Sequence, residues 1–582
     1  MNRAPTRPKL LETGLTGVLL VALSGCAGGA VAAPGAGSAA PTAAAPAYPI
    51  AASVQTTLQA TVLPGTPAAG ATIYPYEVAK YAPNGYGTTT VGPGVAAQKR
   101  LDLMPSTYAA ATATNAARLL NFFAISDIHI ADEETPAGAT FLGFKGGIPG
   151  AYSPVELLTT QVLDAAVQSV NALNKQDPFD FGIALGDATN NSQYNELRWY
   201  LDDLDGKVVS PDSGVKDDPI PGPGNDYQDP FQAAGLDKSI PWYQVVGNHD
   251  HLWMGTAPQD DYLKQAYVGD TMLNVGNPYT SPLGIQSRGF YVGSIDGRTP
   301  NGDVYGVGPV AAFSTPPKVL AADPNRRAIS TTTGFMQEFF NTTSTPVGHG
   351  FTQANLDSGS GSYTFVPTSS VPVKFIVLDD TDANLQPNIT GGQPELDAAR
   401  YQWLVNELDK GQTAGQLMIV AAHIPIGVSK PGSFMDWNPA SVVTENALIA
   451  KLHTYPNLLA WISGHRHANV VTPFASPDPT HPELGFWEIE TSSLRDFPQQ
   501  FRTFQLNRNT DNSVSIVTTD VDPAVKDGSL AALSRSYAVG ADQLFKGARP
   551  YPPSGSYNAE LVKQLTPEMQ AIVANIGVPA GK

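Results

Sequence analysis

The chain has 582 residues, of which 42% are hydrophobic and 9% aromatic, a composition typical of a globular protein that can bury a sizeable core. Its formal charge of −18 at pH 7 argues against nucleic acid as a partner, because proteins that bind nucleic acids draw most of their affinity from Lys and Arg. A small phosphorylated substrate is not excluded, since bound cations can reverse the potential inside a pocket.

Residues 1–26 have the pattern of a signal peptide. Basic residues in the first nine positions precede an apolar run over residues 14–23, which is shorter than the roughly 20 residues that a transmembrane helix needs. The run ends in Leu-Ser-Gly-Cys, which resembles the bacterial lipoprotein box, and Cys26 is the only cysteine. We therefore expect export, lipidation of Cys26 and attachment to the membrane of the cell envelope. Cleavage after Ala32 is the alternative, and it would release a soluble secreted protein.

The rest of the chain divides by composition and pattern into four parts. Residues 27–53 are dominated by Ala, Gly, Pro and Ser, which cannot bury enough apolar surface to fold, so we interpret them as a tether. The other expected parts are an irregular lead-in at 54–118, a main domain at 119–525 and a helical tail at 526–582.

Five apolar runs in the main domain each end at a polar residue that could take part in chemistry. The runs are residues 119–126, 181–185, 242–246, 417–422 and 458–463. The polar residues that follow them include Asp127, Asp187, Asn248, His423 and His465. Because ligands of open α/β sheets bind outside the carboxyl ends of the strands, we expect these side chains to form one site.

Helical patterns lie between the predicted strands. One helix is predicted to begin with Ser153 as N-cap, Pro154 at the first position and Glu156 in a capping box, and to continue to residue 173. A second is predicted over residues 395–410. Strands that alternate with helices predict an α/β fold.

Two long segments interrupt this alternation, and two further elements close the chain. Residues 210–232 are rich in Asp, Pro and Gly, and residues 253–372 are long enough to form a cap over the site. A closing β-hairpin is predicted over residues 501–521, and a terminal helix over residues 558–576.

Five sequence blocks together resemble the calcineurin-like metallophosphoesterases. They are, in chain order, Asp127-Ile128-His129, Gly186-Asp187, Gly247-Asn248-His249-Asp250, the single His423, and Gly464-His465-Arg466-His467. One block alone would be weak, but five blocks in the family's order, each at a predicted strand end, make chance agreement improbable. The resemblance implies a sandwich of two mixed sheets flanked by helices, with the 253–372 insertion as a large cap.

The resemblance also implies two metal ions. Asp127, His129 and His467 would hold one ion, Asn248, His423 and His465 would hold the other, and Asp187 would bridge both. Imidazole and carboxylate ligands suit Mn, Fe, Zn, Co or Ni, and the blocks contain no cysteine for a thiolate site. Two such ions would supply a bridging hydroxide that attacks the phosphorus without a covalent enzyme intermediate.

The family's acid position falls on His249, which would donate a proton to the leaving oxygen. Three residues after the bridging Asp, purple acid phosphatases carry a metal-bound Tyr and many other relatives carry an Asp that orients the catalytic His. Here that position is Asn190, which argues against the first subfamily and would support the ring of His249 without a negative charge.

Two further residues are candidates for contacts with the substrate. Arg495 follows a strand after the His465 block, and guanidinium matches the geometry of phosphate. A surface ion pair is the more common role for such an arginine. His349 lies in a Gly-His-Gly-Phe turn of the expected cap, and its role is left open.

The expected activity is hydrolysis of a phosphomonoester or a phosphodiester outside the cytoplasm. A nuclease is an alternative, against which the acidic charge argues. A surface binding protein on an inactive scaffold is another, but it should lack some ligands, and all seven are present.

Overall fold

The computed structural model describes residues 54–579 except 69, 71, 277–286, 383–391, 432, 434, 548–550 and 553–555. The chain divides into two compact units, Met1–Thr42 and Ala43–Lys582, and all described residues belong to the second. The predicted signal peptide, the tether and Cys26 lie outside the described residues. Within the described part, every helix is too short or too polar to cross a membrane.

The larger of the two main sheets has the strand order β3-β20-β19-β18-β4-β5-β8, and β21 pairs with β4. Its strands are β3 (Gln98–Arg100), β20 (Ala559–Lys563), β19 (Val514–Val521), β18 (Phe501–Asn509), β4 (Asn115–Ile125), β5 (Phe181–Ala184), β8 (Trp242–Gln244) and β21 (Val578–Pro579). β4, β5 and β8 run parallel, so their carboxyl ends meet at one edge of the sheet.

The second main sheet has the order β12-β13-β14-β15-β17-β16. Its strands are β12 (Tyr363–Phe365), β13 (Val373–Leu378), β14 (Leu417–Ala422), β15 (Leu458–Ser463), β17 (Phe486–Glu490) and β16 (Val470–Phe474). β13, β14, β15 and β17 run parallel. Every residue of these four strands is buried, which explains why the sequence shows them as continuous apolar runs.

Aromatic residues join the two main sheets in one core. Phe122 of β4 stacks between Phe181 and Phe504, with ring centroids 4.8 and 4.7 Å away. It also meets the edge of Phe375 from β13 at 5.4 Å. Burial of each such ring contributes about 1.5–3 kcal/mol. The contact ties the strand that leads to Asp127 to the sheet that carries His423.

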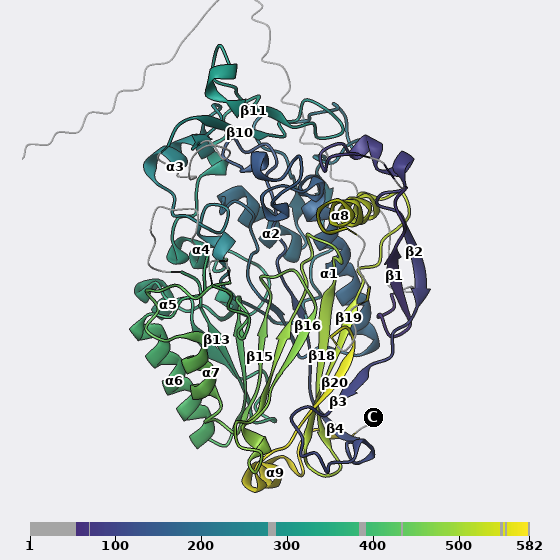
Figure 1. Cartoon of the computed structure of the whole chain (residues 1–582), viewed down its shortest axis with the longest axis vertical. Helices are drawn as coiled ribbons and strands as arrows, with labels where there is room; N and C mark the ends of the chain where they lie inside the picture. The colour runs from purple at the N-terminus through teal and green to yellow at the C-terminus, as the bar shows by residue number, and fades with distance from the viewer. Residues whose placement is uncertain are drawn as a thin grey trace, which may run out of the picture. The chain divides into compact units, whose positions relative to one another are not determined.

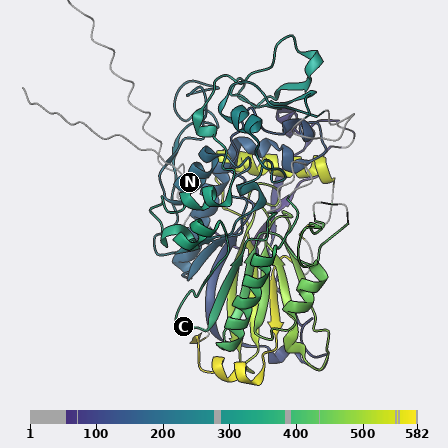
Figure 2. The ribbon, with the colours of Figure 1, turned by 90° about the vertical axis from the view of Figure 1, so that its left-hand side faces the viewer.

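Helices cover both sheets. The α-helices are α1 (Thr159–Gln176), α2 (Tyr194–Leu204), α3 (Asp261–Val268), α4 (Thr332–Glu338), α5 (Gln353–Ser358), α6 (Ala398–Thr413), α7 (Glu445–Leu452), α8 (Leu530–Lys546) and α9 (Pro567–Val573). α6 lies along the six-stranded sheet against β13 and β14, and α7 lies beside it (Figures 1 and 2). Leu163 and Val170 of α1 belong to the same apolar cluster as Ile125 of β4. The predicted mixed α/β class is confirmed.

Two predicted helices differ from the observed ones at their ends. The Ser153 start is present, with Glu156 accepting a hydrogen bond from the Ser153 N–H at 3.2 Å, but it opens a 3-10 helix, Pro154–Leu158, before α1 begins. α6 begins after the N-cap Asp397 and continues past Gly411. Asp397 caps the helix by accepting from the N–H of Arg400, a signal that the sequence contained.

The closing hairpin is confirmed by the pairing of β18 with β19, whereas the helix predicted over residues 558–576 is wrong. Ala559–Lys563 form β20, which adds to the edge of β19, and the helical part is only α9. Val562 and Leu561 are fully buried, so the tertiary contacts of the strand outweigh the local helical pattern.

The lead-in and the two long segments contain small sheets of their own. These are β1 (Ala60–Pro64) with β2 (Thr89–Pro93), β6 (Val208–Val209) with β7 (Phe231–Gln232), and β9 (Asn274–Val275) with β10 (Phe290–Ser294) and β11 (Tyr305–Pro309). The last part of the predicted cap, β12, belongs to the six-stranded sheet.

Candidate metal centre

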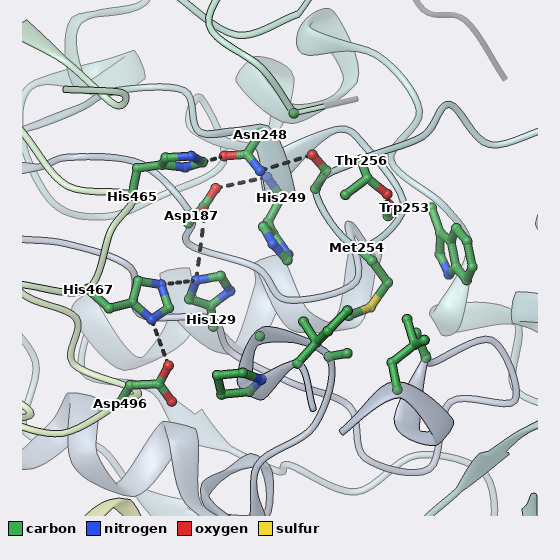
Figure 3. A pocket seen from close by; sticks show the side chains of 18 of the residues that line it. His129, Asp187, Asn248, His249, Trp253, Met254, Thr256, His465, His467 and Asp496 are labelled. Carbon is green, nitrogen blue, oxygen red and sulfur yellow. Dashed lines mark hydrogen bonds and ion pairs between the residues drawn. The ribbon is translucent and has the colours of Figure 1, made fainter. Parts of the chain in front are cut away.

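The strands of both main sheets deliver the predicted ligands to one place. β4 leads to Asp127, β5 to Asp187, β14 to His423 and β15 to His465. Backbone hydrogen bonds join the loops that follow, such as Asp127 N–H to Gly186 O at 3.2 Å and Gly464 N–H to His423 O at 3.0 Å. Figure 3 shows His129, Asp187, Asn248, His465 and His467 facing one another.

Three groups of side chains are close enough to hold a metal ion, with ligand atoms within 4.8 Å of one another. The groups are Asp127 with His129 and His467, His129 with Asp187 and His249, and Asp187 with His423 and His465. The six predicted carboxylate and imidazole ligands are therefore together, and His249, predicted as the acid, joins one group. Carboxylate and imidazole donors of this kind fit a divalent transition metal.

The backbone of the site is strained at most of the ligands. Asp127, His129, Asp187, His465 and His467 all have positive φ angles, between 48° and 68°. Residues other than glycine rarely adopt this region, because the side chain crowds the backbone, and each instance costs of order 1–3 kcal/mol. Strain concentrated at the predicted ligands indicates that their placement matters for function.

Asp187 lies between the first and the third group. Its Oδ2 is 3.6 Å from His129 Nε2 and 3.2 Å from His423 Nε2. Its other oxygen accepts a hydrogen bond from the backbone N–H of His249 at 2.8 Å. One carboxylate oxygen is thus available to both groups while the second fixes the side chain.

Two of the imidazole rings are oriented through their second nitrogen atoms, whereas His129 Nδ1 is buried without a hydrogen-bond partner. His423 Nδ1 is 2.7 Å from the carbonyl oxygen of Leu185, and His467 Nδ1 is 2.7 Å from Asp496 Oδ2. Each contact leaves Nε2 to face the cluster, where His467 Nε2 is 3.3 Å from Asp127 Oδ1. Such partners typically set the tautomer and orientation of metal-binding histidines.

The amide of Asn248 is also oriented. Its Nδ2 donates to the carbonyl oxygen of Gly255 at 2.9 Å, so its Oδ1 faces His465 Nδ1 at 3.1 Å. Asn248 therefore presents an oxygen to the cluster, as the resemblance implied.

Two carboxylates that support the site were not identified as functional from the sequence. Asp250 is fully buried and accepts hydrogen bonds from four backbone N–H groups, those of Asp187, Ala188, Thr189 and Gly247. Asp496 is the partner of His467. Asp250 stands inside the third block, which is a signal in the sequence, whereas Asp496, 29 residues after His467, had no sequence signal.

The predicted support of His249 by the Asn190 side chain is wrong. His249 Nδ1 is 2.7 Å from the backbone carbonyl oxygen of Asn190, and Asn190 Oδ1 is buried without a hydrogen-bond partner. The orientation of the ring therefore depends on the backbone at this position rather than on the amide. Burial lowers the pKa of His249, an effect that the charge of Asp187 opposes.

Charge pairs dominate the electrostatics of the cluster. Burial alone would raise the pKa of Asp127, but the charge and hydrogen bond of His467 and the charge of His423 together outweigh it and hold the pKa at about 2. Burial lowers the pKa of His423, but Asp187 outweighs this effect and raises it to about 10. In the same way Asp127 raises the pKa of His467 to about 9. A metal cation would take the place of the protons that these carboxylates stabilise.

Neither predicted substrate contact is supported. Arg495 is fully buried, and its Nη2 donates to Glu156 Oε1 at 2.6 Å, so the guanidinium is used in an internal ion pair. His349 is also fully buried; its ring stacks on Trp242 at 3.7 Å between centroids and its Nδ1 faces the Trp242 carbonyl oxygen. Neither residue lines the pocket, although Arg495 also donates to the carbonyl oxygen of Pro149, which does.

A cavity of about 480 Å³ adjoins the cluster. Its lining includes His129, Asp187, Asn248, His249 and His467. The size lies within the range of small-molecule sites, so a ligand has room to reach the predicted ligands and His249.

No protein-family model matches the chain, and no curated protein matches it. Among solved structures, the chain is similar to a dimetal phosphatase from Danio rerio, with 11% sequence identity and a TM-score of 0.35. The similarity covers 70% of this chain and 97% of that chain. At this level of likeness the function has to be inferred from the side chains of the site.

Proposed function

We propose that the protein is a metal-dependent phosphoric ester hydrolase of the calcineurin-like type, built on that family's two-sheet sandwich. The observation that carries the proposal is Asp187, whose Oδ2 lies within 3.6 Å of imidazole nitrogens from two separate groups. A shared carboxylate between two sets of nitrogen and oxygen donors suits a pair of metal ions better than a single one.

Asp127, His129 and His467 would hold one ion, and Asn248, His423 and His465 the other. Bound there, two cations would lower the pKa of a water molecule and neutralise charge on the phosphoryl oxygens. The chain itself holds the ligand side chains in place through the contacts of Leu185, Asp496 and Gly255.

His249 is the residue placed to handle the proton of the leaving group. Its ring lines the pocket, packs edge-on against His129 at 4.6 Å between centroids and is oriented through the Asn190 carbonyl oxygen. A general acid at this position typically contributes 10²–10⁴-fold in rate.

The test combines metal analysis with initial rates on p-nitrophenyl phosphate and bis-p-nitrophenyl phosphate after reconstitution with Mn, Fe, Zn, Co or Ni. We expect about two metal ions per chain and clear turnover of one ester. Asp187→Ala should lose both metal and activity, because each set of donors then lacks a ligand. His481→Asn, on an exposed histidine paired with Glu483, is the matched control and should keep both.

A protein that binds no transition metal, or one that holds metal without hydrolysing either ester, would overturn the proposal. The second result would favour a binding protein on an inactive scaffold. Turnover of DNA or RNA in place of the small esters would favour the nuclease alternative.

We further propose that the protein is exported and anchored to the membrane of the cell envelope through a lipid on Cys26. The support is the sequence of the leader, in which the only cysteine ends the Leu-Ser-Gly-Cys box. Lipoprotein processing would supply more than one acyl chain, which stable anchoring requires.

A further inference from the structure

The cavity beside the metal centre has two chemically different sides. The predicted metal ligands and His249 form one side. Apolar residues form the other, chiefly Phe141, Leu142, Ile148, Trp253, Met254 and Val275. In Figure 3, Trp253 and Met254 lie across the pocket from His465 and His467.

The apolar side is a fixed wall rather than a set of loose side chains. Phe141, Trp253 and Val275 are 4%, 3% and 2% exposed and belong to one buried apolar cluster with Phe290 of β10. The Trp253 Nε1–H donates to the Ala137 carbonyl oxygen at 2.7 Å, which joins the two loops that form the wall. The wall therefore keeps its shape through packing that does not involve the metal centre.

The turn at residues 253–256 ties this wall to the reacting groups. Gly255 has a φ of 66°, and a Cβ atom there would lie 2.3 Å from both Asn248 Nδ2 and His249 Cδ2. Only glycine allows the turn to approach so closely. Because Asn248 also donates to the Gly255 carbonyl oxygen, the neighbouring Met254 is held at a fixed place beside His249.

The described lining offers few polar groups outside the metal centre. Thr256 is its one uncharged hydroxyl side chain, and that hydroxyl donates to the Trp253 carbonyl oxygen at 3.3 Å. Of the two basic residues, Arg466 is paired with Glu490, and Lys546 lies 3.3 Å from Asp542 at the end of α8. A sugar or a nucleobase against the apolar wall would leave hydroxyl or amide groups without partners, at a cost of about 1–3 kcal/mol each.

We propose that this wall binds the alcohol part of the substrate, and that the substrate is a phosphate ester of an apolar, hydrocarbon-bearing alcohol. The proposal rests on the hydrolase activity proposed above. The phosphoryl group faces the metal centre while the hydrocarbon lies against Phe141, Met254 and Val275. Lipid-derived and aryl alcohols share this chemistry, and the experiment includes both.

The experiment compares kcat/KM for ethyl, butyl and hexyl phosphates, their p-nitrophenyl diesters, phenyl phosphate and glycerol phosphate. Burial of each methylene group should raise kcat/KM by about fourfold until the pocket is filled. Phenyl phosphate should also exceed glycerol phosphate. If only the alkyl series shows the increase in kcat/KM, the alcohol part of the substrate is lipid-derived. If only phenyl phosphate is preferred, the alcohol part is aryl.

A binding measurement gives a readout that does not depend on turnover. Hexylphosphonate should bind to the metal-loaded protein at least tenfold more tightly than ethylphosphonate. Ile148→Ser, at a wall position that is 43% exposed, should lower the ratio of hexyl to ethyl kcat/KM without unfolding the chain. The matched control is Leu320→Ser, 42% exposed outside the pocket, which should leave that ratio unchanged.

Two outcomes would overturn the inference, and they separate it from the proposed function. Hydrolysis with no dependence on chain length, or with glycerol phosphate preferred, overturns the apolar substrate class but leaves the hydrolase standing. No hydrolysis of any ester by the metal-loaded protein overturns both.

Discussion

Asp250 offers the sharpest test of how the site is held together. Its two carboxylate oxygens accept four backbone hydrogen bonds, with Oδ1 taking those of Ala188 and Thr189 at 2.8 and 3.2 Å. Oδ2 takes those of Gly247 and Asp187 at 2.8 and 3.1 Å. Burial and the charge of Asp187 raise the pKa of Asp250 to about 8. The four donors around it nevertheless offer no acceptor for a carboxyl proton, so the ionised form fits the geometry.

The substitution Asp250→Asn keeps the volume and replaces one oxygen by an amide N–H₂. Two of the four backbone donors would then face another donor in a fully buried position. An unsatisfied buried donor costs about 1–3 kcal/mol, so we expect a loss of about 2–6 kcal/mol in the free energy of unfolding. The two loops that carry Asp187 and Asn248 should separate, so metal affinity should fall as well.

The assay is denaturant unfolding followed by tryptophan fluorescence, with metal content measured on the same samples. Asp478→Asn is the control, because that carboxylate also accepts from a backbone N–H, that of Thr480 at 2.9 Å, but is exposed. The control should change stability by less than about 0.5 kcal/mol. A variant at Asp250 with the unfolding midpoint and metal content of the unchanged protein would refute the reasoning.

Three further predictions concern other parts of the chain. On esters with poor leaving groups, the Asn190→Ala variant should retain at least tenfold more activity than the His249→Ala variant, because the contact to the His249 ring comes from the backbone of residue 190. Equal losses of activity in the two variants would contradict this. Burial and Asp132 raise the pKa of Glu134 to about 9, so the native state keeps a proton that the unfolded chain releases above about pH 4.5. Stability should therefore fall as pH rises from 6 to 9, and Glu134→Gln should show a smaller fall in melting temperature over that range. Cys26→Ser should release the protein from the membrane without lowering its specific activity, and persistent membrane attachment would exclude the lipid anchor.

The strand ends could be predicted because each one combines two strong signals. A fully buried parallel strand is a continuous apolar run, and the residues after it are polar, as at Ala422 and His423. The order of the blocks then predicts that Asp127, Asp187 and His465 lie together. Local signals of this kind depend only on a few neighbouring residues, so a single sequence carries them.

Contacts between distant segments could not be predicted in the same way. Asp496 orients His467 from a loop after β17. Asn190 contacts His249 through its backbone carbonyl oxygen, and the type of side chain at a position does not indicate a backbone contact of this kind. In the tail, residues 559–563 form a strand because β19 offers a free edge, although their local pattern resembles a helix. In each case the deciding partner lies elsewhere in the chain.

The apolar wall illustrates why the metal centre was easier to predict than the substrate. Metal ligands must be particular residue types at strand ends, so their identity is visible in the sequence. Phe141, Trp253 and Val275 are ordinary core residues by composition, and they become a binding surface only because Gly255 and the Trp253–Ala137 hydrogen bond place them beside His249. The cluster that packs behind the wall would stabilise the fold with or without a ligand, so selection for stability and for an apolar substrate would leave the same residues. Only their position against the metal centre separates the two, which is why the chain-length dependence of hydrolysis, rather than stability, tests this surface.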